Sequence, residues 1–250
     1  MSILLKHKAE RLCRIICILF SICLSSCDKE SDALLVDVLD EEYQLYDYYI
    51  DEYGNEGVVA YIQNGSSISN YPKGYKCVVV LSLDESIEPW GPMGEILMKK
   101  DSLSGSELKQ RTAGIMMLQS MSSKGIEKYP AQNWCFNKNH SKVIAASSWR
   151  LPSYYELQLI FGSSGKNVSA INKYIHNYGG SIIDDSHFYW TCIEDYEGYI
   201  TINGVTSDYD QANRAVLTST HNSTWGNKDR WLKKNKYYVR AIKYIYYYDY

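Results

Sequence analysis

The chain has 250 residues, 45% of them hydrophobic, and a formal net charge of -3, which is adequate for one packed domain plus a tether. Residues 57–250 carry 21 Lys or Arg and 17 Asp or Glu, a net charge of +4. A charge so small, spread over so many residues, excludes the cationic stripe that nucleic acids require. The 24 tyrosines, against four phenylalanines, favour half-buried strands and binding surfaces.

The first residues have the layout of an export signal. Four basic residues precede an apolar run at residues 15–24 that carries no charge. The run is about half as long as the ~20 residues that a membrane-spanning helix needs. We therefore predict a signal peptide over residues 1–26.

The residues after the apolar run resemble the lipobox of bacterial lipoproteins: Leu24, Ser25, Ser26 and Cys27. The resemblance implies that Cys27 carries acyl chains such as palmitate, and these alone would hold the protein on a membrane. The alternative is an ordinary cleaved signal followed by an incidental cysteine.

An acidic run follows this cysteine and includes Asp28, Glu30 and Asp32. In the Bacteroides group, such a run resembles a signal that sends lipoproteins to the outer face of the outer membrane. In enterobacteria, an aspartate directly after the cysteine resembles an inner-membrane retention signal. We expect an outer-membrane lipoprotein that faces the exterior.

Residues 27–56 form a predicted acidic tether. Residues 28–56 carry eleven Asp or Glu and one Lys, a net charge of -10, which favours an extended segment. Five apolar or aromatic residues within it could instead dock on the domain: Leu45, Tyr46, Tyr48, Tyr49 and Ile50. We place the domain at residues 57–250.

The first half of this domain begins with two apolar runs, at residues 58–62 and 76–83, which predict a hairpin of two strands. The Pro- and Gly-rich residues 86–104 predict a loop. A helical pattern follows at residues 106–121, and Pro130 suits the first position of a short helix.

The second half opens with a capping box, Ser153 and Glu156, so a helix is predicted to start after Pro152. Another helix is predicted at residues 168–178, ending at Gly179 and Gly180. The pattern then changes, and residues 187–193, 198–205, 214–218 and 237–245 predict short strands.

Several words of sequence, in this order, resemble the DUF1566 group, also called the Lcl C-terminal domain family. They are Val79 to Asp84, Tyr129 to Ala131, Trp149 to Ser153 with Glu156 and Leu157, Tyr189 to Thr191, and Val239 to Ala241. The resemblance runs from about residue 57 to residue 245. It implies an α+β, C-type-lectin-like fold, in which short twisted antiparallel sheets and flanking helices support long irregular loops.

The chain departs from the family in one place and from true C-type lectins in another. Thr191 and Cys192 stand where the family commonly has two serines, and the calcium-binding triplet of true C-type lectins is absent. Calcium-dependent sugar binding is therefore not carried over, and we expect no cofactor.

Most of the shared residues also have structural explanations. Trp149, Leu151 and Trp190 are predicted core residues, and Arg240 is a predicted partner of a nearby carboxylate. After Cys27 three cysteines remain: Cys77, Cys135 and Cys192. One disulfide with a free thiol and three buried thiols both fit this number, and no spacing predicts a zinc site.

Two loops are candidates for binding, because in such a fold the scaffold uses its side chains for packing. The first carries five carboxylates near one predicted strand: Asp184, Asp185, Glu194, Asp195 and Glu197. They could hold Ca²⁺ or form a solvated acidic rim. The second is residues 218–231, where indoles stand beside amides and carboxylates: Trp225, Asn227, Asp229 and Trp231. Such groups suit a sugar, although Trp225 could instead pack on the core.

No motif for a nucleophile, a phosphate loop or a catalytic dyad is present, so we expect no catalytic residues. We predict a non-catalytic recognition module, an adhesin that binds a glycan or a cell-surface protein. The alternative is a structural accessory or tip component of a surface fibre or uptake complex.

Overall fold

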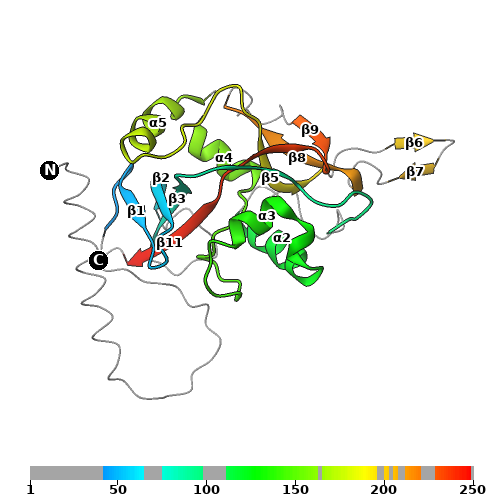
Figure 1. Ribbon diagram of the computed structural model, residues 1–250, viewed down its shortest axis with the longest axis horizontal. Helices are drawn as coiled ribbons and strands as arrows, with labels where there is room; N and C mark the ends of the chain where they lie inside the picture. The colour runs from blue at the N-terminus through cyan, green and yellow to red at the C-terminus, as the bar shows by residue number, and fades with distance from the viewer. Residues whose placement is uncertain are drawn as a thin grey trace, which may run out of the picture. The chain divides into compact units, whose positions relative to one another are not determined.

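Two small sheets make up most of the structure, a computed structural model that describes residues 42–64, 75–97, 111–162, 165–195, 200–202, 205–207, 212–220 and 229–248. All of these belong to one compact unit, Val36–Tyr250. The first sheet, sheet A, has the order β1-β2-β3-β11. It consists of β1 (Tyr48–Ile50), β2 (Glu56–Asn64), β3 (Tyr75–Ser82) and β11 (Ile242–Tyr248) (Figure 1). The predicted hairpin at residues 58–83 is confirmed as the antiparallel pair β2 and β3.

The folded unit includes part of the predicted tether. Tyr48 in β1 pairs with Val58 in β2, and Tyr43, Tyr48 and Tyr49 are buried. The buried Asp51 carboxylate closes the β1–β2 turn by accepting the Asn55 N–H at 2.8 Å. The alternative that this part of the tether docks on the domain is therefore the correct one, because burying these tyrosine rings is more favourable than leaving them in water.

Sheet B has the order β4-β10-β5-β8-β9, and a separate pair joins β6 (Ile200–Ile202) to β7 (Val205–Ser207). Its strands are β4 (Ser86–Pro89), β10 (Lys236–Val239), β5 (Tyr189–Glu194), β8 (Arg214–Thr218) and β9 (Asp229–Leu232). The β10–β5 pair is parallel and the others are antiparallel. The predicted loop at residues 86–104 was wrong in part, because it contains β4.

The predicted strand at residues 237–245 is two strands in different sheets. The chain leaves sheet B after β10 and enters sheet A at β11. At the break, the buried Arg240 guanidinium donates to the Ser181 carbonyl at 2.6 Å and to Glu85 at 2.7 Å. The predicted carboxylate partner of Arg240 is thus confirmed, and its hydrogen bonds hold the chain where it changes sheet.

The helices are α2 (Arg111–Ser123), the 3-10 turn η5 (Ile126–Lys128), α3 (Pro130–Phe136), α4 (Tyr154–Phe161) and α5 (Val168–Asn177). Figure 1 shows α2 and α3 together below β5, and α5 beside β1 and β2. The predicted capping box is confirmed at the start of α4, and Pro130 stands at the first turn of α3. Gly179, with φ of 77°, follows α5 as predicted.

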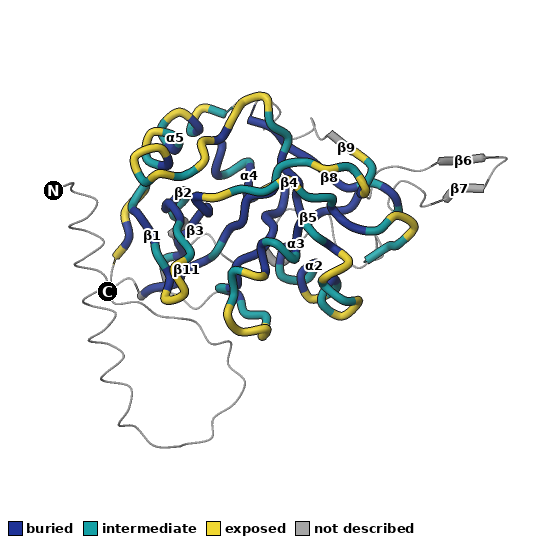
Figure 2. Tube along the Cα trace, viewed as in Figure 1, coloured by how far each residue is buried: buried dark blue, intermediate teal, exposed yellow. Residues whose placement is uncertain are grey.

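The core contains three fully buried tryptophans, Trp90, Trp149 and Trp190. Strands β3, β5 and β11 are buried along most of their length (Figure 2). Each indole N–H has an internal acceptor, as for Trp149, which donates to Asp51 at 2.8 Å. The architecture is α+β, with antiparallel pairing dominant and few helices, as the sequence predicts.

One ion pair lies inside this core. Arg150 contacts Glu156 through both terminal nitrogens, at 2.9 Å from Nη1 to Oε2, and the Tyr244 hydroxyl donates to Glu156 at 2.6 Å. Burial opposes the charge of Glu156, but the Arg150 charge and these hydrogen bonds keep the pKa of Glu156 below its usual value. Glu156 thus joins α4 to β11 in addition to capping its helix.

Candidate recognition surface

The first predicted loop does not form one carboxylate cluster. Asp184 and Asp185 are exposed, and each is engaged locally. Asp184 accepts the Ser186 hydroxyl at 2.6 Å, and hydrogen bonds from Ser186 lower the pKa of Asp184. Asp185 accepts the Thr220 hydroxyl at 2.7 Å. These bonds fix the turn that precedes β5.

Glu194 and Asp195 are instead buried in ion pairs. The Lys233 ammonium lies 2.6 Å from Glu194, and both side chains are fully buried. Glu194 also accepts the backbone N–H of Leu97, and Asp195 lies 3.2 Å from Arg230 Nε. Burial lowers the pKa of Lys233, although Glu194 opposes the shift. The geometry therefore gives Glu194 and Asp195 internal partners at the end of β5.

The predicted acidic rim is not assembled by the residues that the structure describes. Among them, no group of three His, Cys, Asp or Glu side chains is placed to hold a metal ion. Glu197 lies outside the described residues.

The second predicted loop is described only at its end. Trp225 and Asn227 lie outside the described residues, as do residues 221–228 as a whole. Asp229 opens β9 opposite Leu217, and Trp231 lies opposite Ala215. The Trp231 side chain is 47% exposed, which is unusual for an indole in a strand.

Trp231 is part of a continuous aromatic surface. Its ring centroid lies 5.8 Å from that of Tyr237 in β10. The Tyr237 ring also meets two other rings edge to face. Its centroid lies 6.4 Å from that of Phe188 and 5.2 Å from that of the buried Trp190. We name Phe188, Tyr237 and Trp231 the aromatic platform, which rests on Trp190. Phe188 and Tyr237 are half-buried, so all three residues of the platform retain some exposure to solvent.

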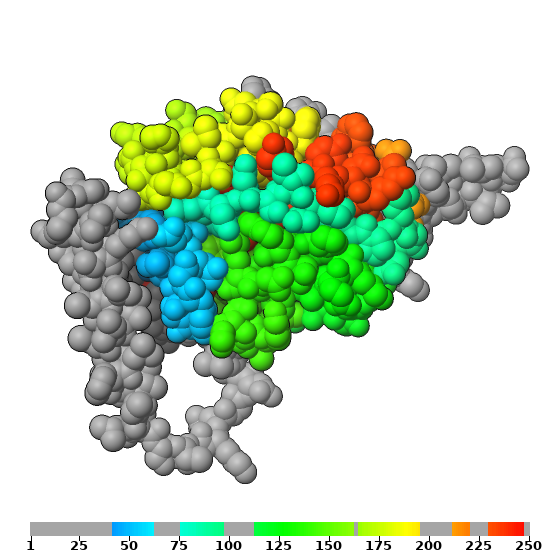
Figure 3. Space-filling view, in the orientation of Figure 1, coloured from blue at the N-terminus to red at the C-terminus, as the bar shows by residue number. Residues whose placement is uncertain are grey.

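The platform is held by the short turn between β9 and β10. The Lys233 N–H donates to the Asn213 carbonyl at 2.9 Å, and the Lys233 carbonyl accepts the Trp90 N–H at 2.9 Å. Figure 3 shows this end of sheet B as an orange-red surface, residues 230–238, beside the turquoise segment that contains β4. Both backbone groups of Lys233 are thus fixed, which limits the movement of the two rings that flank the turn.

Sequence reasoning selected Trp231 but missed Phe188 and Tyr237. Both stood in predicted strands, and alternation places Phe188 on the same face as Trp190. The missing information was the parallel pairing of β10 with β5, which brings residue 237 beside residue 188.

The three cysteines are buried free thiols, so the alternative without a disulfide is the correct one. Burial raises the thiol pKa of Cys77, Cys135 and Cys192. The reactive thiolate form of each cysteine is therefore disfavoured. Within the described part of the chain, no helix has the length and hydropathy of a membrane span.

Comparisons with known proteins extend to the fold alone. No family model matches the chain, and no curated protein matches it in sequence. A solved structure of a fimbrial protein from Bacteroides ovatus is similar, with a TM-score of 0.53 and 14% sequence identity. The match covers 80% of this chain and 48% of that protein, so this chain spans about half of its length.

Proposed function

We propose that this protein is a non-catalytic recognition module on a bacterial surface, which binds a glycan or a surface protein through the aromatic platform. The observation that carries the proposal is the half-exposed Trp231 ring beside Tyr237, supported from below by Trp190. Burying such an indole against a ligand contributes more binding free energy than most surface side chains can. A fixed platform also loses little conformational entropy on binding.

The placement on the cell surface rests on three supports. The export signal and the lipobox at Cys27 imply a lipoprotein, and the acidic run after Cys27 favours the outer membrane. The similar structure is a fimbrial protein, which agrees with a surface location. We further propose that the fold is C-type-lectin-like and of the DUF1566 type, in line with its short antiparallel sheets and flanking helices.

A glycan array with the purified protein tests the proposal. Trp231→Ala is expected to lower the affinity for the glycans that the unchanged protein binds by at least tenfold, since an aromatic anchor contributes about 2 kcal/mol or more. Tyr155→Ala is the matched control, because Tyr155 is a 39% exposed aromatic on α4. Equal binding by Trp231→Ala and the unchanged protein would contradict the proposal.

We also propose that binding needs no calcium, because Glu194 and Asp195 are already engaged by Lys233 and Arg230. Binding should then be the same in EDTA and in millimolar calcium. A loss in EDTA that calcium restores would contradict this part.

A second candidate is a structural accessory or tip component of a surface fibre or uptake complex. The similarity to a fimbrial protein favours it. Cross-linking on intact cells, followed by detergent extraction, should then recover a stoichiometric protein partner in the absence of any glycan. Recovery of the protein as a monomer alone would speak against this candidate.

A further inference from the structure

The face of sheet B that carries the platform also carries a carboxylate, that of Glu88 in β4. Glu88 is paired directly with Tyr237 across the β4–β10 ladder. Directly opposed residues point to the same face, with their Cβ atoms about 4.5–5.5 Å apart. The Glu88 carbonyl also accepts the Trp190 indole N–H at 3.0 Å. The carboxylate is thus placed beside the central ring of the platform.

This carboxylate is held in place but retains accepting capacity. Glu88 is half-buried, and the Ser86 hydroxyl donates to its Oε1 at 2.7 Å. Among the described residues, no other hydrogen bond or ion pair reaches the Glu88 carboxylate. A carboxylate offers about four acceptor positions, so Oε2 can accept two further donors.

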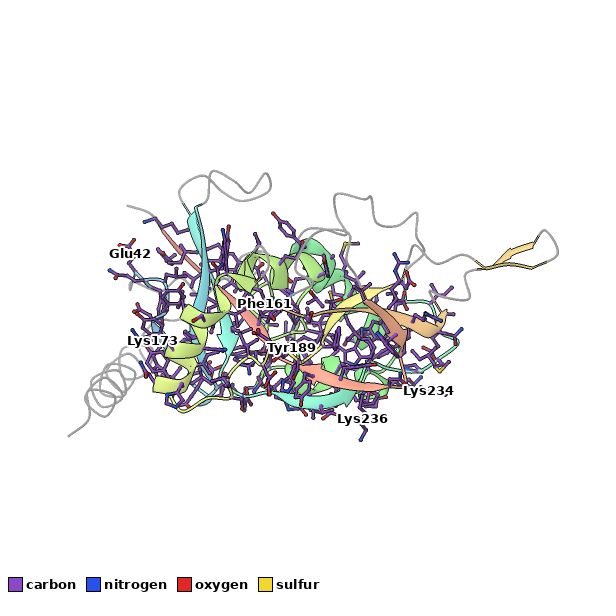
Figure 4. All side chains as sticks on the ribbon, turned by 90° about the horizontal axis from the view of Figure 1, so that it is seen from above. Glu42, Phe161, Lys173, Tyr189, Lys234 and Lys236 are labelled. Atoms are coloured by element: carbon purple, nitrogen blue, oxygen red, sulfur yellow. The ribbon has the colours of Figure 1, made fainter. Side chains whose placement is uncertain are left out.

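The nearby cations lie elsewhere. Lys236 precedes Tyr237 in β10, so alternation turns it to the opposite face, where it pairs with Pro89. The Lys233 and Arg230 charges are neutralised by Glu194 and Asp195. Figure 4 shows Lys234 and Lys236 at the outer boundary of the molecule, near the turn between β9 and β10. The position next to Tyr237 therefore combines aromatic rings with one negative charge.

From this arrangement we infer that the ligand of the platform is an uncharged sugar ring with adjacent hydroxyl groups, and that Glu88 selects it. The C–H face of the ring packs on Tyr237 and Trp231, while the two hydroxyls donate to Oε2 of Glu88. An anionic sugar is rejected at this position, because its own carboxylate or sulfate would meet Glu88 without a counter-charge. The inference rests on the proposed function and adds the ligand class and the selecting residue.

Array binding by three further variants of the purified protein tests it, with neutral, anionic and amine-bearing glycans as probes. Glu88→Gln keeps the size of the side chain and one acceptor, but it removes the charge-assisted hydrogen bonds, so affinity for neutral glycans should fall about tenfold. Glu52→Gln, on the exposed β1–β2 turn, and Lys236→Gln should leave that affinity unchanged.

The outcomes separate the inference from the proposed function. Neutral glycans that need both Trp231 and Glu88 support both. If the unchanged protein prefers anionic glycans and Trp231→Ala weakens that binding, the inference is overturned and the platform remains a binding site. A preference for amine-bearing glycans also overturns the inference. So does an affinity for neutral glycans that is the same in Glu88→Gln and in the unchanged protein. If Trp231→Ala leaves glycan affinity unchanged, the proposed function itself is overturned.

Discussion

Replacing Glu194 by leucine would leave the Lys233 ammonium without its carboxylate partner in a fully buried position. The two groups lie 2.6 Å apart. Without Glu194, the ammonium would keep its hydrogen bond to the Glu95 carbonyl at 2.8 Å and a cation–π contact 4.7 Å from the Trp90 ring, but neither supplies a negative charge. Removing one member of a buried pair costs about 3–5 kcal/mol of unfolding free energy. The Leu97 N–H would also lose its acceptor. For a domain of this size, the melting temperature should fall by roughly 6–20 °C.

Urea unfolding, followed by tryptophan fluorescence, measures this loss. The double variant Glu194→Leu with Lys233→Met should recover most of the stability, because neither charge is then buried. Glu52→Gln, an exposed control, should change the unfolding free energy by less than about 0.5 kcal/mol. The reasoning is refuted if Glu194→Leu unfolds at the urea concentration of the unchanged protein. Loss of ligand binding in that stable variant would make Glu194 a ligand contact, as the sequence suggested.

Three further predictions concern the core. The pKa of Glu156 is lowered in the folded state, so its contribution to the unfolding free energy is present above the ordinary pKa of 4.5 and is lost as the pH falls through the folded pKa. The unfolding free energy should therefore drop in that acid range, and it should drop less steeply in Glu156→Gln. A Cβ at Gly114 would lie 2.1 Å from Arg150 Nη1, so Gly114→Ala should destabilise by about 1–3 kcal/mol in urea unfolding, whereas a stable variant would show that the guanidinium can move. Thiol labelling read by peptide mass spectrometry should leave the native protein unmodified at Cys77, Cys135 and Cys192, and rapid labelling before unfolding would contradict their burial.

The local part of the fold could be predicted from the sequence. The capping box at Ser153 and the glycine after α5 depend on neighbours within a few residues, and both were located correctly. Strand β8 was predicted at its full length for the same reason. The sheet change at Arg240 could not be predicted, because the residues that hold it, Ser181 and Glu85, are distant in the sequence.

The candidate site was predictable only in part, and the reason is again distance along the chain. Carboxylates in a polar loop look alike in a sequence, whether they face solvent or a buried cation. Lys233 is 39 residues from Glu194, so their pairing appears only in the fold. The platform needed the β10–β5 pairing, which joins two segments that the sequence places far apart.

The short connection that takes the chain from sheet B to sheet A also affects how the domain unfolds. Strands β10 and β11 are separated by two residues. Arg240, which lies between them, donates to the Ser82 carbonyl at the end of β3 in sheet A and to Glu85, which precedes β4 in sheet B. We therefore expect that β10 and β11 detach only together and that the two sheets unfold as one cooperative unit. The backbone amides of β10 and β11 should exchange with deuterium at similar rates, limited by global unfolding. The end of sheet B that carries the platform would then open only when the whole domain does.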